Sequence, residues 1–90
     1  MLARIATFDQ APGSIDDRAV TRLREIVRAQ PGFRVGYHLQ DPKSGKVMSI
    51  VVVDGPETFA AMGEALAARA PEDRVGVDPE HVEFYEGVEF

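Results

Sequence analysis

Four short stretches of the chain have the composition and the two-residue alternation that are typical of β-strands. They are residues 2–8, 33–40, 47–53 and 81–89. The third stretch contains the unbroken apolar run 50–53, which predicts a central strand covered on both faces. In the second stretch the alternation is strict and predicts one face made of Phe33, Val35, Tyr37 and Leu39, and another made of Arg34, Gly36, His38 and Gln40.

Two longer stretches repeat apolar residues every three or four positions, which predicts amphipathic helices. The first begins near Ser14 to Asp16, whose side-chain oxygens are good helix caps, and ends at Pro31-Gly32. The second opens at 54–57 and ends at Pro71, before an acidic connection over 72–80 that we expect to contain a short helical turn. The predicted buried stripes are Ala19, Val20, Leu23, Ile26 and Val27 in the first helix, and Phe59, Met62, Gly63, Leu66 and Ala70 in the second.

The order of these elements is β-α-β-β-α-β, with a turn at 41–46 that joins the middle strands as a hairpin. This order predicts one α+β domain over residues 1–90, a ferredoxin-like fold with an antiparallel sheet. Right-handed crossovers place both helices on one face of the sheet. The other face is left bare although it carries large apolar side chains, and we therefore expect a homodimer formed through that face.

Composition narrows the class of protein further. The chain has 90 residues and a net charge of −5, which argues against a nucleic-acid partner. Its acidity is concentrated near the end, because residues 72–90 hold seven acids and one arginine, whereas residues 1–71 hold nine bases and eight acids. Cysteine is absent, which excludes disulfides and thiolate chemistry, and no apolar run approaches the length of a membrane span. We expect a cytoplasmic protein with no membrane partner.

Several short motifs cover nearly the whole chain: 4–8 (RIATF), 30–33 (QPGF), 36–41 (GYHLQD) with 44–46 (SGK), 48–49 (MS) and 82–86 (VEFYE). In this order they resemble the antibiotic-biosynthesis-monooxygenase-like family. The resemblance implies a dimeric α/β barrel, in which two sheets meet face to face and each subunit has a cleft between its sheet and its helices. Members include cofactor-free quinone-forming oxygenases and haem-degrading monooxygenases.

The chain departs from this family at the residues that carry its chemistry. The haem-degrading members use an Asn, a Trp and a His, and simple alignment puts Thr7, Met62 and Glu72 at or near those positions. The chain contains no Asn and no Trp at all, and Val53 stands where many relatives end the third strand with Trp. These departures argue against haem degradation and weaken the assignment to the quinone-forming oxygenases. We expect no cofactor and no metal.

His38 is the candidate catalytic residue, because a histidine of near-neutral pKa can act as a general base. Arg34 on the same predicted face is a candidate for holding an anionic substrate. A simple exposed or hydrogen-bonded strand histidine is the alternative for His38. The other candidate substrate-binding residues are Thr7, expected to face the helices, Phe59 and Met62, expected to line the same cleft unless they are only core, and Tyr85.

The remaining charged residues are explained by solvent exposure and need no functional site. His81 lies near Glu83 and Tyr85 on one predicted strand face, but the histidine spacing fits no metal motif, and an acidic solvated edge strand explains these residues. The arginines of the first helix are spread over its exposed arc, which is typical of a solvated face.

Two functions remain open from the sequence. The first is a cofactor-independent monooxygenase, or a related enzyme, that acts on a small aromatic or quinone-like molecule. The second is a non-catalytic binding or assembly domain that has lost the family's Asn and Trp. An open cleft reached by His38 or Tyr85 would favour the first function, and a cleft packed shut by Phe59, Met62 and Leu66 would favour the second.

Overall fold

The computed structural model describes residues 1–9, 17–70 and 79–90 of the chain. Its four strands form one antiparallel sheet in the spatial order β2-β3-β1-β4. The strands are β1 (Leu2–Phe8), β2 (Phe33–Gln40), β3 (Val47–Val53) and β4 (His81–Glu86). The first three have the predicted bounds, whereas β4 ends three residues before the predicted end at 89.

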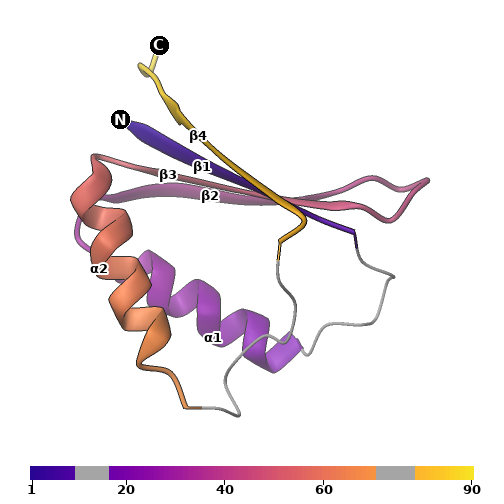
Figure 1. Cartoon of the computed structure of the whole chain (residues 1–90), viewed down its shortest axis with the longest axis horizontal. Helices are drawn as coiled ribbons and strands as arrows, with labels where there is room; N and C mark the ends of the chain where they lie inside the picture. The colour runs from indigo at the N-terminus through magenta and orange to yellow at the C-terminus, as the bar shows by residue number, and fades with distance from the viewer. Residues whose placement is uncertain (10–16, 71–78) are drawn as a thin grey trace.

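Both helices cover the same face of the sheet, as Figure 1 shows. They are α1 (Asp17–Arg28) and α2 (Pro56–Ala67). The element order and the antiparallel sheet confirm the predicted ferredoxin-like α+β fold. The predicted cap of the first helix at Ser14 to Asp16 and most of the connection predicted over 72–80 lie outside the described residues.

The core lies between the sheet and the two helices. Val27 of α1, Val53 of β3 and Met62 of α2 form its buried centre, and Leu23, Phe33 and Leu66 are among the side chains packed against them. The predicted stripe of α1 is confirmed, because its five members are the least exposed residues over 18–28. The stripe of α2 needs a correction: Gly63 is exposed, while Thr58 is buried.

The strict alternation predicted for β2 is broken at its start. Phe33 lies opposite Val53 and Val35 lies opposite Val52, so that Arg34 is an extra residue in the strand. Because neighbouring residues of β3 face opposite sides of the sheet, Phe33 and Val35 do too. The bulge therefore turns Phe33 into the core, and the prediction that it shares a face with Val35 was wrong.

The face of the sheet opposite the helices carries an apolar surface, which we call the open face. Tyr37, Leu39 and Met48 on this face are 55%, 48% and 37% exposed. Strand register places these side chains on the same side as Ile5 and Ile50. Among the described residues, no helix is long and apolar enough to cross a membrane.

Candidate functional site

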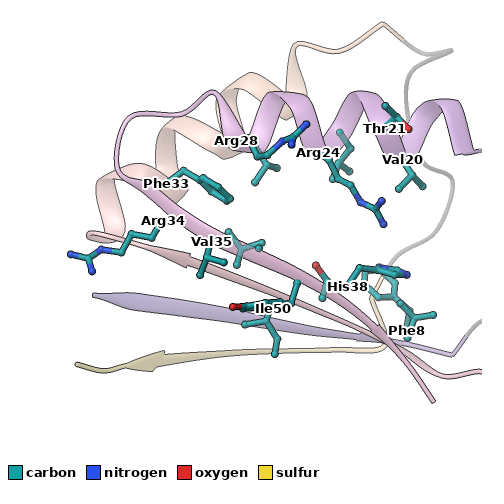
Figure 2. Close-up of a pocket in the computed structure, with 17 residues that line it drawn as sticks. Phe8, Val20, Thr21, Arg24, Arg28, Phe33, Arg34, Val35, His38 and Ile50 are labelled. Carbon is teal, nitrogen blue, oxygen red and sulfur yellow. The ribbon is translucent and has the colours of Figure 1, made fainter. Parts of the chain in front are cut away.

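An open cavity of about 700 Å³ lies between α1 and the strands β2 and β3 (Figure 2). One wall is the apolar stripe of α1, and the other is the helix-facing side of the sheet. Its volume is in the range of small-molecule sites. The side chains and backbone that line it belong to Phe8, Val20, Thr21, Leu23, Arg24, Val27, Arg28, Phe33, Arg34, Val35, Gly36, Tyr37, His38, Val47, Ser49, Ile50 and Val51.

His38 lies on the sheet wall of this cavity, a position that the sequence had left open. It is paired with Ser49 of β3, which in turn lies opposite the buried Ala6 of β1, so its side chain points toward the helices. Partial burial, and secondarily the positive charge of Arg24, lower the pKa of His38 below its ordinary value. At neutral pH the imidazole is therefore uncharged and able to accept a proton.

Arg24 and Arg28 of α1 also line the cavity, and sequence analysis missed both as site residues. In Figure 2 the Arg24 side chain reaches from α1 toward His38. A signal for this position was present, because Arg24 follows Val20 by four residues and precedes the buried Val27 by three. Arg24 thus borders the apolar stripe and does not lie at the centre of the solvated arc.

Arg34 lines the same cavity, but its guanidinium is already engaged. Its Nε donates a hydrogen bond to Asp54 Oδ1 at 2.5 Å, and Figure 2 shows the side chain directed away from His38. The Asp54 carboxylate, through this bond and its charge, raises the pKa of Arg34. This pairing follows from the bulge, which displaces Arg34 from the register that the sequence predicted.

Phe59 and Met62, two predicted ligand-binding residues, lie under α2 and do not line this cavity. Met62 is 5% exposed and belongs to the buried centre of the core, against which Phe59 packs. The Phe59 ring also meets Phe84 of β4 edge to face, with ring centroids 5.6 Å apart. Both residues therefore belong to the hydrophobic core, which the sequence analysis had kept as the alternative to ligand binding.

Thr7 and Tyr85 lie on the open face of the sheet, away from the cavity. Thr7 follows the buried Ala6 and lies opposite Met48, and Tyr85 lies opposite Ala3. The prediction that Thr7 faces the helices was wrong, because it took the alternation of the first strand in the opposite phase.

The predicted clustering of His81, Glu83 and Tyr85 is present on the open face. His81 Nε2 and Glu83 Oε1 are 2.6 Å apart, and the Tyr85 hydroxyl donates a hydrogen bond to the other oxygen of Glu83. These bonds, the one from Tyr85 first, lower the pKa of Glu83, while the carboxylate raises the pKa of Tyr85. Within the described part of the chain, no three potential metal-ligating side chains come together.

Several solved structures have the same fold as this chain over nearly its whole length, and some of them are described as antibiotic biosynthesis monooxygenases. A candidate antibiotic biosynthesis monooxygenase from Chloroflexus aurantiacus J-10-fl is similar over 99% of this chain and 94% of its own, with 20% identity and a TM-score of 0.66. An antibiotic biosynthesis monooxygenase is similar over 99% and 100%, with 18% identity and a TM-score of 0.65.

A third similar structure is SnoaB from Streptomyces nogalater, described as a cofactor-independent oxygenase. It matches 99% of this chain and 91% of its own at 18% identity, with a TM-score of 0.58. No protein-family model and no curated protein sequence matches the chain. The resemblance inferred from the short motifs is therefore confirmed at the level of the fold.

Proposed function

We propose that this protein is a cofactor-independent monooxygenase, or a closely related enzyme, that acts on a small aromatic molecule with an ionisable hydroxyl group. One observation carries the proposal: an open, largely apolar cavity has a histidine on its wall, and partial burial lowers the pKa of that histidine. The similarity in fold to SnoaB, a cofactor-independent oxygenase, supports the same class of reaction.

In the proposed reaction the flat apolar part of the substrate packs between Val20 and Leu23 of α1 and Val51 of β3. The substrate hydroxyl donates its hydrogen bond to the free imidazole nitrogen of His38, which then takes the proton as general base. The resulting phenolate is electron-rich and reacts with molecular oxygen. A ring C–H carbon para to the phenolate oxygen then becomes a carbonyl: this carbon gains one oxygen atom, and its hydrogen leaves with the other oxygen atom and the proton that His38 took, as one molecule of water. The substrate therefore supplies every electron that the oxygen molecule accepts.

The chain has no Asn and no Trp, so the proposal assigns the role of proton acceptor to His38. A non-catalytic binding domain is the alternative, and a cavity filled by side chains of α2 would have supported it. Phe59, Met62 and Leu66 do pack together in the core, which is the arrangement that the alternative expects under α2. The cavity between α1 and the sheet is separate, stays open and is reached by His38, and this second observation supports the enzyme.

The test is oxygen consumption by the purified protein with a panel of naphthols and anthrones. We expect at least one to be turned over, and we expect His38→Ala to lower kcat/KM about 100-fold, the typical contribution of a general base. Arg22→Gln, on the exposed side of α1, is the control. Binding of these compounds without oxygen uptake would favour the binding domain, and turnover unchanged in His38→Ala would refute the catalytic role.

We further propose that two copies pair through the open face. The exposed apolar side chains of Tyr37, Leu39 and Met48 support this partner, because a contiguous apolar sheet surface on a small acidic chain needs cover. A second copy offers the same surface and meets it symmetrically. A cytoplasmic location stays a prediction of the composition.

A further inference from the structure

The cavity is positively charged although the chain as a whole is acidic. Its lining includes Arg24, Arg28 and Arg34, and no Asp or Glu is among the described residues that line it. The whole chain has a net charge of −5, so its composition does not explain why three arginines line one cavity. A concave site lined by charges of one sign raises the local concentration of ligands of the opposite sign.

Two of the three arginines are available to a ligand. Arg34 is paired with Asp54, whereas Arg24 and Arg28 make no hydrogen bond or ion pair with another described residue. They stand four positions apart on α1, where side chains are neighbours and like charges repel. An anion between them would relieve that repulsion and accept charge-assisted hydrogen bonds from both.

We propose that Arg24 and Arg28 bind an acidic group of the substrate, so that the preferred ligand is an aromatic hydroxy acid. This inference rests on the proposed function, which it makes more specific. The guanidinium groups hold the carboxylate at the α1 side of the cavity, and the ring lies along the apolar wall. The hydroxyl then meets His38 on the sheet side.

The position of Arg24 also restricts the geometry of the ligand. Arg24 is close enough to His38 to affect its titration, and Figure 2 shows it reaching toward the imidazole. A ligand that meets both side chains therefore carries its carboxylate and its hydroxyl on the same ring system, as in 1-hydroxy-2-naphthoate. The carboxylate of such an acid also neutralises the charge of Arg24. Because that charge lowers the pKa of His38, the pKa of His38 rises while the acid is bound.

The experiment is isothermal titration calorimetry at neutral pH and low salt, with 1-hydroxy-2-naphthoate and the uncharged 1-naphthol as a matched pair. We expect the naphthoate to bind about tenfold or more tightly than the naphthol. Arg24→Gln and Arg28→Gln should each remove most of this preference while leaving the affinity for naphthol nearly unchanged. Arg22→Gln makes the same change of charge on the exposed side of α1 and should retain the preference.

Equal affinity for the two compounds would overturn the inference, and so would a preference that Arg22→Gln weakens as much as Arg24→Gln does. Oxygen uptake with the same pair separates this inference from the proposed function. Arginine-dependent binding without oxygen uptake by any compound of the panel would refute the enzyme and keep the anion site. Turnover of the naphthol with no preference for the acid would refute the anion site and keep the enzyme.

Discussion

The Thr58 hydroxyl in the first turns of α2 donates a hydrogen bond of 3.0 Å to the carbonyl oxygen of Pro31. Thr58 is 3% exposed, and Pro31 belongs to the turn between α1 and β2. Gly32, the next residue, has a φ of +91° and packs so close to the Thr58 hydroxyl that a Cβ would collide with it. This contact fixes the end of β2 that leads into the cavity wall.

Thr58→Val should lower the free energy of unfolding by about 1–2 kcal/mol, because the valine keeps the shape of threonine but leaves the Pro31 carbonyl without its donor. Urea denaturation measures the change. Thr21→Val, at an exposed position of α1, is the control and should stay within about 0.5 kcal/mol of the parent protein. Equal stability of all three proteins would show that the hydrogen bond contributes nothing.

Gly32→Ala should be more harmful than Thr58→Val, since the added Cβ both collides with Thr58 and meets a positive φ that alanine rarely adopts. We expect a loss of about 2 kcal/mol or more in the same denaturation assay. The double variant with Thr58→Ala removes the collision but not the backbone strain. It should therefore be less destabilised than the sum of the single changes, and strict additivity would contradict the contact.

Sequence periodicity was sufficient for the fold because each strand and helix had its own apolar pattern. It put His38 and Gln40 on one face of β2, since the alternation of β2 is regular from Val35 onward, but it did not decide whether that face meets the cavity. It failed for Phe33, because a bulge adds one residue and nothing in the local pattern marks it. For Thr7, both faces of β1 carry apolar residues, so the pattern could not decide which face meets the helices.

Arg24 and Arg28 were missed for a different reason. The spacing of Arg24 from Val20 and Val27 shows that it lies beside the apolar stripe, but an arginine beside a stripe can meet either water or the mouth of a cavity. The tilt of α1 relative to β2 and β3 decides between the two, and that tilt is a tertiary property. The core role of Phe59 and Met62 depends likewise on where α2 rests on the sheet.

Replacing Arg24 should change the titration of His38. Burial and the charge of Arg24 both lower the pKa of His38, so Arg24→Gln should raise it, though not fully to the ordinary value because burial remains. NMR titration of the imidazole protons measures this pKa, and His38→Gln identifies which of the two histidine signals belongs to His38. A pKa unchanged in Arg24→Gln would show that the guanidinium does not reach His38.

The same lowered pKa predicts how stability depends on pH. Between the folded and unfolded pKa values of His38, the unfolded chain binds more protons, so stability rises with pH. As the pH falls from about 6.5, the ordinary value, through the lower folded value, this residue should destabilise the fold. The free energy of unfolding of His38→Gln should therefore fall less steeply over that window, and identical pH profiles for the two proteins would contradict the shift.

Leu39→Lys should convert the proposed dimer into a monomer, because it puts a charge among the exposed apolar side chains of the open face, beside Tyr37 and Met48. Leu39 is 48% exposed in the single chain, and covering it in a dimer removes apolar surface from water. A buried, unpaired ammonium in its place costs several kcal/mol of association free energy. Sedimentation-velocity centrifugation over a range of concentrations distinguishes the two states.

Gln40→Lys is the matched control for this experiment. Gln40 is the next residue of β2, is exposed and, by the alternation of the strand, faces the opposite side of the sheet. The same added charge at that position should leave the association unchanged. A dimer that survives Leu39→Lys but dissociates in Gln40→Lys would move the interface to the helix side, where it would cover the cavity and contradict both the open-face dimer and access of a ligand to His38.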